Sequence, residues 1–218
     1  ATGNIADVEF ALSSGENLLD AAGKTLTAVK ITSESGTDGG TTIKAGSIVG
    51  RSASSLSSIT LGDNDYNNIE VSGAVKNASV NTGESAGSFT AGSVDTLDLA
   101  MGGTGSADQS VTINGKANKL TYTGAQGKDT LKILGAVSNS EIDLGAGANS
   151  FSAKKGDKLQ SVSNTNITSG AGNTTLEMGN YTFLNTKDAD LGNKITLGAG
   201  TNKITMGSIS GSGTAGLT

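Results

Sequence analysis

Residues 195–207, ITLGAGTNKITMG, carry the pattern that decides the fold of this chain. Two short stretches in which apolar and polar residues alternate flank a tight, glycine-rich loop. An alternation of period two indicates a β-strand with one buried face, so the segment predicts a strand, a loop and a second strand. The same design recurs at residues 142–153 (IDLGAGANSFSA) and 167–179 (ITSGAGNTTLEMG), and more loosely at residues 59–73 (ITLGDNDYNNIEVSG).

Pairs of the form apolar-x-apolar continue from residue 59 to residue 206. Successive pairs begin at Leu120, Leu131 and Ile142, in steps of 11 residues. The loops between them repeat the sequence GAG-x-N. Such repetition is expected when successive coils stack in register, because each loop then packs against the equivalent loop of the next coil. We therefore predict an all-β fold, a parallel β-solenoid of the β-roll or β-helix type, over residues 56–218. Coils with two sides, of about 20 residues, and coils with three sides, of about 30 residues, both fit this spacing.

Residues 1–55 are less regular, and we expect them to form either an N-terminal cap or the first irregular coils of the solenoid. Val8, Phe10 and Leu12 alternate with polar residues, as in a half-buried strand. Residues 16–22 (ENLLDAA) lie between two glycines and predict a single helical turn. Further along, residues 80–89 and 154–166 are expected to form bulged loops.

The composition favours thin repeated layers over one thick core. Glycine accounts for 33 of 218 residues, while proline and tryptophan are absent. The net charge of −5, with Arg51 as the only arginine and no basic run, excludes a nucleic-acid-binding surface. No stretch of the sequence is apolar over the length that a membrane-spanning helix requires.

The chain contains no cysteine, has a pI near 4.7 and uses lysine in preference to arginine. Together with the abundance of Gly, Ser, Thr and Asn, this predicts an extracellular or cell-surface protein of a bacterium or an archaeon. No signal peptide is visible at Ala1, so we expect either that one has been removed or that export follows another route.

Residues 124–132, GAQGKDTLK, resemble the glycine-aspartate nonapeptide of RTX-type bacterial repeats, with Ala125 in place of the second glycine. Residues 144–152 and 197–205 are similar, but Asn149 and Asn202 stand where that family has aspartate. The resemblance implies a secreted parallel β-roll that binds calcium in its loops through carboxylates and backbone carbonyls. The composition also resembles that of bacterial surface-layer proteins.

Calcium is the one cofactor for which the sequence offers ligands. Asp129, Asp63 and Asp65 are the candidate metal ligands, because calcium favours sites with several oxygens and prominent carboxylates. The alternative is that these aspartates simply form turns. Where asparagine replaces aspartate, the stacked amides are expected to hydrogen-bond along a ladder and to satisfy loop backbone groups.

The sequence contains no catalytic constellation. Histidine is absent, which removes the commonest general base and metal ligand. Serine is abundant, but without His or Cys a nucleophile would need a lysine or carboxylate helper, and the sequence identifies none. A polysaccharide hydrolase or lyase would need two carboxylates, for which Glu70, Glu141 and Glu177 are the candidates; solvated outward positions are the alternative. Ice binding would need regular Thr-x-Thr rows, which only Thr25/Thr27 and Thr121/Thr123 supply.

We therefore expect a non-enzymatic extracellular structural protein, the building block of a surface layer, a fibre or a large adhesin. The alternatives are a calcium-binding RTX-like repeat domain of a secreted protein and a polysaccharide-active β-helix enzyme. The expected partners are copies of the chain itself, joined head to tail through open strand edges, with a cell-surface or matrix polysaccharide as a further candidate. Residues 211–218 (GSGTAGLT) are expected to be too short to cover the last layer.

Overall fold

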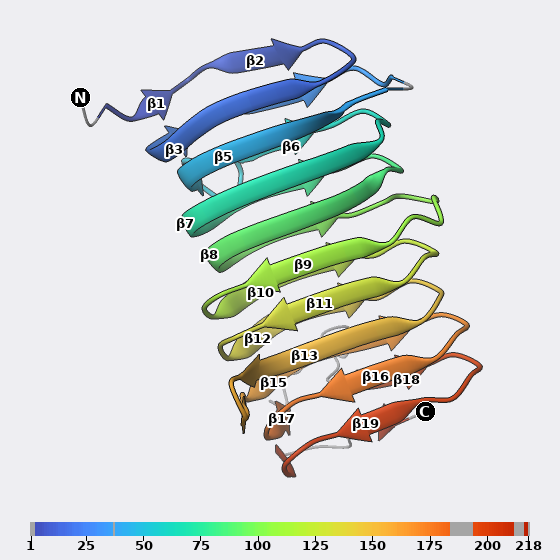
Figure 1. Ribbon diagram of the computed structural model, residues 1–218. Coiled ribbons are helices and arrows are strands. Elements are labelled where there is room, and N and C mark those ends of the chain that lie inside the picture. The colour runs from blue at the N-terminus through green and yellow to red at the C-terminus, as the bar shows by residue number, and fades with distance from the viewer. Residues whose placement is uncertain (1–2, 37, 184–193, 212–215, 218) are drawn as a thin grey trace.

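The computed structural model describes residues 3–36, 38–183, 194–211 and 216–217. Within these residues the chain forms strands and no helix, and it winds into a β-solenoid of about eight turns (Figure 1). The pairings between successive coils are parallel, and β13–β14 is an antiparallel hairpin. The predicted all-β solenoid is confirmed. No helix long and apolar enough to cross a membrane occurs among the described residues.

The strands, in chain order, are β1 (Ile5–Ala6), β2 (Glu9–Leu12), β3 (Asn17–Thr27), β4 (Lys30–Ser33), β5 (Gly40–Val49), β6 (Ser57–Thr60), β7 (Tyr66–Asn81), β8 (Ala86–Ala100), β9 (Gln109–Ile113), β10 (Ala117–Thr123), β11 (Asp129–Ile133), β12 (Val137–Asp143), β13 (Asn149–Lys155), β14 (Lys158–Leu159), β15 (Val162–Ser169), β16 (Thr174–Glu177), β17 (Tyr181–Phe183), β18 (Lys194–Leu197), β19 (Lys203–Thr205), β20 (Ile209–Gly211) and β21 (Gly216–Leu217).

Each coil contributes to two ladders of strands. The first ladder contains β9, β11, β13, β16 and β19, and the second contains β10, β12, β15 and β18. In the most regular part the repeat is 20 residues, since Leu131 pairs with Val111 on one side and with Phe151 on the other. The second ladder bends where Lys119, Asn139 and Asn164 adopt positive φ angles of 52°, 52° and 45°.

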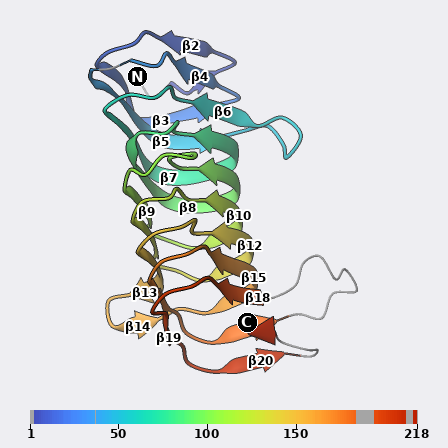
Figure 2. The same cartoon turned by 90° about the vertical axis from the view of Figure 1, so that its right-hand side faces the viewer.

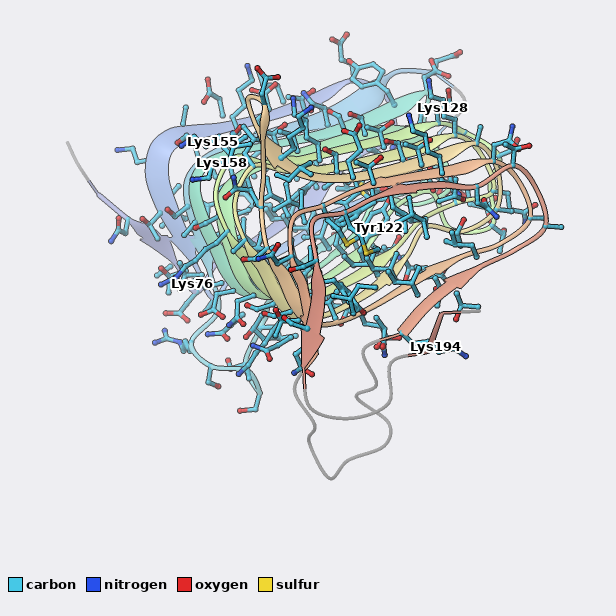
Figure 3. The ribbon with its side chains drawn as sticks, turned by 90° about the horizontal axis from the view of Figure 1, so that it is seen from below. Lys76, Tyr122, Lys128, Lys155, Lys158 and Lys194 are labelled. Atoms are coloured by element: carbon cyan, nitrogen blue, oxygen red, sulfur yellow. The ribbon has the colours of Figure 1, made fainter. Side chains whose placement is uncertain are left out.

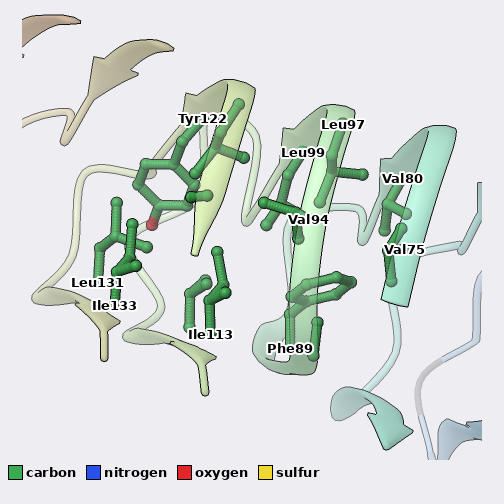
Figure 4. Close-up of a cluster of buried hydrophobic side chains, with 14 of the residues drawn as sticks. Val75, Val80, Phe89, Val94, Leu97, Leu99, Ile113, Tyr122, Leu131 and Ile133 are labelled. Carbon is green, nitrogen blue, oxygen red and sulfur yellow. The ribbon is translucent and has the colours of Figure 1, made fainter. Parts of the chain in front are cut away.

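Several inward-facing columns of apolar side chains fill the space between the ladders, as Figure 4 shows for the middle coils. Every second residue of a strand points inward, and each inward residue stacks on its equivalent in the next coil. Viewed along the stack, Tyr122 lies inside the coils and Lys76 and Lys128 lie outside (Figure 3). One column of the first ladder is Ile43, Ile69, Phe89, Val111, Leu131, Phe151 and Leu176, and one column of the second ladder is Ile31, Ile59, Val80, Leu99, Tyr122, Ile142, Ile167 and Ile195. A further column, on the other side of the bend, is Ile5, Leu26, Ile48, Val75, Val94, Ala117, Val137, Val162, Tyr181 and Ile209.

The predicted alternation of buried and exposed residues holds, and it weakens at the last coil. Leu144 is fully buried and Asp143 is exposed. In the last coils Leu197, Ile204 and Met206 pack against the core but are only partly buried. Their columns have no further described coil on one side, so one face of each side chain lacks a neighbour.

The close stacking of the loops explains why the sequence GAG is repeated. A Cβ atom added to Gly147 would overlap the carbonyl oxygen of Gly127 in the preceding coil, and one added to Gly172 would overlap the carbonyl oxygen of Gly147. Both glycines also have positive φ angles, of 100° and 130°. Glycine at this position therefore allows the loop backbones to approach at the spacing that the strands impose.

The strands of residues 1–55 pair in the same parallel arrangement as the later strands, through β1–β3, β2–β4 and β3–β5 (Figure 2). The helical turn expected at residues 16–22 is wrong, because residues 17–27 form strand β3. Pairing with β5 satisfies the backbone groups of this segment, whereas one isolated helical turn would leave most of its N–H and C=O groups without a partner.

The two segments expected to be bulged loops, and the C-terminal tail, also contain strands. Residues 80–81 end β7 and residues 86–89 begin β8, so only four residues, 82–85, connect them. Residues 154–166 contain the β13–β14 hairpin, which projects from the coil (Figure 2), and the first half of β15. Beyond Met206, β20 and β21 pair with β17 and β18, so the described part of the tail, which was expected to be too short to cover the last layer, adds a short strand to it.

Candidate functional site

A column of polar residues marks the point where each loop enters the first ladder. Asn67, Gln109, Asp129, Asn149, Thr174 and Asn202 occupy this position in their coils, with Gly87 between Asn67 and Gln109. We call this set the loop-closing column. Its members from Asn67 to Thr174, Gly87 apart, are buried polar residues, whereas Asn202 in the last coil is exposed.

The amides of this column close the loops. Asn149 Nδ2 donates to the carbonyl oxygens of Gly145 at 3.0 Å and Ala146 at 3.1 Å, and Asn202 Nδ2 donates to that of Gly198 at 2.9 Å. The column also links coils, since the N–H of Thr174 donates to Asn202 Oδ1 at 3.1 Å. Stacked asparagines therefore hydrogen-bond loop backbone groups, as expected from the sequence.

Asp129 is the ionisable member of the column and is fully buried. Its Oδ2 accepts a hydrogen bond from the N–H of Ala125 at 2.6 Å, and its Oδ1 has no hydrogen-bond partner. Gly124 makes room for the carboxyl group, because a Cβ atom there would overlap Asp129 Oδ2. Burial raises the pKa of Asp129 from 3.8 to about 6, and the backbone hydrogen bond from Ala125 opposes the rise in part.

The surroundings of Asp129 fit a neutral acid better than a calcium ligand. Its neighbours in the column are the amides Gln109 and Asn149, and one carboxyl oxygen is already bonded to the backbone. Calcium takes six to eight oxygen ligands, usually with several carboxylates among them. The sequence left open a calcium ligand and a turn-forming aspartate at this position, and it did not predict complete burial. The hydrogen bond from the N–H of Ala125 is of the turn-forming kind, and calcium binding at Asp129 stays a prediction.

Asp63 and Asp65 lie in an exposed loop three coils before that of Asp129. Asp63 Oδ1 accepts the N–H of Glu84 at 2.7 Å, and Asp65 Oδ2 accepts the N–H of Gly39 at 3.0 Å, so both carboxylates tie their loop to a neighbouring one. Among the described residues no group of three or more acidic, His or Cys side chains is placed to hold a metal ion. Calcium binding at Asp63 and Asp65 stays a prediction.

The three glutamates considered for catalysis do not form a compact group. Glu70 and Glu177 occupy one outward column of the first ladder and are separated by five coil steps, about 24 Å at the usual strand spacing. Glu141 lies on the second ladder. Carboxylates that cleave a glycosidic bond lie about 5–9.5 Å apart, so Glu70 and Glu177 do not pair in this way.

The two threonine pairs considered for ice binding are not repeated along the stack. Thr25 pairs with Ser47, and Thr27 pairs with Ala6 and Val49. Thr121 pairs with Asp98 and Glu141, and Thr123 pairs with Ala100 and Asp143. Flat rows of identical hydroxyl groups are therefore absent at these positions.

A groove on the outer surface of the bend in the second ladder was not anticipated. We call it the corner groove. It has a volume of about 440 Å³ and is lined by residues of β8, β10, β12 and β15, including Thr96, Lys119, Thr121, Glu141, Asn164 and Asn166. The only sequence signal was asparagine, which adopts positive φ more readily than most residues, at Asn139 and Asn164. Thr96 and Lys119 occupy the same bend without any such signal.

Comparison of the chain with models of known protein families, with characterised proteins and with solved structures found no match in any of the three. The resemblance of residues 124–132 to RTX-type repeats therefore stays a prediction.

Proposed function

We propose that this protein is an extracellular structural protein whose copies stack end to end to build a surface layer, a fibre or an adhesin. The observation that carries the proposal is the open strand edge at each end of the described solenoid. β1, β2 and the first half of β3 pair on one side only, as do β19, β20 and β21. Unpaired edges of this kind are templates for another strand unless they are blocked.

The apolar columns run to these edges and support the proposal. Ile5 and Phe10 at one end are only partly buried, and Ile209 at the other end is 54% exposed. Ile5 and Ile209 begin and end the same column, which runs through Leu26 at one end and Tyr181 at the other. A second copy stacked in register would remove this apolar surface from water, which favours association.

The charges of the end coils support a head-to-tail arrangement. Residues 1–21 contain four acidic residues, Asp7, Glu9, Glu16 and Asp20, and no Lys or Arg. Asp7 and Glu9 form ion pairs with Arg51 and Lys30, so the acidic charge of this end rests chiefly on Glu16 and Asp20. The described coil at the other end, residues 194–211, contains Lys194 and Lys203 and no acidic residue. Opposite charges favour contact between unlike ends and disfavour contact between like ends. Such a heterologous contact generates a filament when it does not close into a ring.

Electron microscopy and sizing of the purified chain over a range of concentrations test the proposal. We expect polymers that lengthen with concentration and shorten as salt rises, because salt screens the contact between charged ends. Ile209→Lys places a charge on the inward column at the edge and should abolish the polymers. Ser210→Lys adds the same charge to the neighbouring outward position and should preserve them. A wild-type chain that is monomeric at every concentration would refute end-to-end assembly.

A further inference from the structure

One coil of the solenoid carries a short insertion whose tip lies outside the core. Ile133 and Val137 are four residues apart, whereas their equivalents in the next coil, Ala153 and Val162, are nine residues apart. The extra residues allow the β13–β14 hairpin to project from the stack (Figure 2). Residues 155–158 at its tip are exposed, so the tip contributes no buried surface to the solenoid.

The base of this hairpin is tied to two coils. The N–H of Gln160 donates to the carbonyl oxygen of Ala153 at 2.8 Å, and the carbonyl oxygen of Gln160 accepts the N–H of Gly179 from the next coil at 2.7 Å. Gly156 has a φ angle of 58°, which suits the first position of a tight hairpin turn. The hairpin therefore holds its tip at a defined place on the flank of the stack.

The tip presents two lysines that face one another. Lys155 and Lys158 are directly opposite each other on the two strands, and both are exposed. Like charges in this arrangement destabilise a hairpin. Neither lysine takes part in an ion pair within the described part of the chain, and this includes Asp157 in the turn between them. We call these two residues the lysine tip, and an anion from outside the hairpin would stabilise it.

The other side of the solenoid carries exposed carboxylates at a suitable spacing. Glu141 and Asp143 lie on the outward face of β12, two residues apart, and so about 6.6 Å apart along the strand. Directly opposed side chains of a hairpin, such as those of the lysine tip, have Cβ atoms about 4.5–5.5 Å apart. Because lysine side chains are long and flexible, the two ammonium groups of the tip can reach both carboxylates at once.

The surroundings of these carboxylates are acidic. Asp98 occupies the position of Glu141 two coils earlier, and it is also exposed. We call Asp98, Glu141 and Asp143 the acidic flank. None of the three takes part in an ion pair among the described residues. The strand segments that carry this flank, residues 94–100, 117–123 and 137–143, contain four acidic residues and one lysine, Lys119.

One molecule cannot bring its own lysine tip to its own acidic flank. Figure 2 shows the β13–β14 hairpin on the opposite side of the stack from strands β10 and β12. A second copy lying beside the first can place its acidic flank against the tip. Since the chain has a net charge of −5, two copies repel each other in general, and local complementarity selects the surfaces that meet.

We propose that the lysine tip of one copy binds the acidic flank of a second copy beside it, with Lys155 and Lys158 pairing with Glu141 and Asp143. The contact joins different surfaces of the two copies, so it repeats from copy to copy. This inference extends the proposed function and rests on it in one respect: side contacts join end-to-end filaments into a layer, whereas end-to-end stacking alone gives a fibre.

Sedimentation velocity of the full chain carrying Ile209→Lys tests the side contact separately, because that substitution blocks end-to-end assembly. We expect association at low ionic strength that added salt removes. Lys155→Glu with Lys158→Glu in this background should weaken the association at least about 10-fold, since like charges then face one another. Lys76→Glu with Lys128→Glu makes the same change in net charge at exposed positions outside the hairpin (Figure 3) and should have little effect.

The same loss is expected when the acidic flank is reversed by Glu141→Lys with Asp143→Lys. A chain with both reversals has the original net charge and exchanged signs, so its association should return. Circular dichroism establishes that each variant is folded. The proposal is overturned if the Ile209→Lys chain stays monomeric at low ionic strength, if the reversed tip and its control associate equally, or if the double reversal does not restore association.

Electron microscopy of the chain with unmodified ends connects the side contact to assembly. Filaments should lie side by side in the wild type and separately in the variant with the reversed tip, and filaments that stay side by side in that variant would contradict the proposal. Failure of end-to-end assembly would leave the sedimentation measurement unaffected, so the two proposals can fail independently.

Discussion

The backbone N–H of Asp129 donates a hydrogen bond to Oδ1 of Asn149, its equivalent one coil further along, at 2.9 Å. The two residues occupy the same position, yet their side chains act in opposite senses. Asn149 donates to the carbonyl oxygen of Gly145, four residues earlier, whereas Asp129 accepts from the N–H of Ala125, four residues earlier. Each coil thus places a polar side chain at the same position of the loop-closing column. Whether that side chain donates or accepts the hydrogen bond to its loop depends on whether the residue is asparagine or aspartate.

The stability of the protein should fall as the pH rises through about 6, because Asp129 then ionises inside the fold. Its folded-state pKa of about 6 lies above the usual 3.8, so the folded state holds the proton more tightly than the unfolded state. The protonated carboxyl group of Asp129 therefore contributes its full stabilisation below a pH of about 4. This contribution is lost as the pH rises through the folded-state pKa. Asp129→Asn should remove this dependence and raise the free energy of unfolding at pH 8 by about 1–3 kcal/mol.

Urea unfolding at several pH values, followed by circular dichroism, measures this effect. Asp143→Asn is the matched control, since Asp143 is exposed and lies only six residues before Asn149 of the loop-closing column. The assignment of Asp129 as a buried acid fails if its substitution lowers stability at pH 8, or if the control removes the pH dependence equally well.

Truncating the core should cost far more than truncating the neighbouring outward residue. Leu131 is fully buried between Val111 and Phe151, so Leu131→Ala should lower the free energy of unfolding by about 2–5 kcal/mol. Thr130→Ala, one residue earlier on the outer face, should cost less than about 1 kcal/mol. Thermal and urea unfolding of the two variants provide the comparison, and similar costs would contradict the strand register.

A methyl group in the stacked loops should be poorly tolerated. Gly147→Ala would overlap the carbonyl oxygen of Gly127 and would also strain the backbone, so we expect a loss of about 3 kcal/mol or more. Gly156→Ala is the control, because Gly156 also has positive φ but has open space around it. Gly156→Ala should lower the free energy of unfolding by about 1–2 kcal/mol, because only the strain of a positive φ angle at alanine contributes. If the two variants unfold at the same temperature, stacking of the loops is not what requires glycine at position 147.

Removal of calcium should leave the fold unchanged, because amide side chains already hydrogen-bond the backbone of the loops, at Asn67, Gln109, Asn149 and Asn202. Far-UV circular dichroism in the presence of a chelator should match that of the calcium-loaded protein. A chain that unfolds with chelator and refolds with calcium would support the RTX-like alternative. Asp63→Asn and Asp65→Asn would then identify the ligands, with Asp129→Asn as the comparison inside the core.

The solenoid could be predicted because its cause is local. A period-two pattern such as Ile142, Leu144 specifies a strand with one buried face, and a repeated loop specifies stacking. The helical turn expected at residues 16–22 was wrong because the partner that makes β3 a strand, β5, lies more than 20 residues away. Local propensity carries no information about that pairing.

The polar features of the structure could be predicted only in part. Stacked asparagines were expected at Asn149 and Asn202, but the complete burial of Asp129 depends on the space left by Gly124, five residues earlier. The corner groove depends on backbone angles at Thr96 and Lys119, whose residue types give no sign of positive φ. Sequence patterns report which face of a strand is buried more readily than where the chain bends.

The hydrogen bonds between coils lie along the axis of the stack, which determines how the molecule responds to a pulling force. Each coil contacts only its neighbours, so tension along the axis loads the coil interfaces in series, and the weakest one yields first. A detached coil of 20 residues releases about 65 Å of chain from a layer about 4.8 Å thick. A filament of such units would therefore lengthen stepwise and absorb work before it breaks.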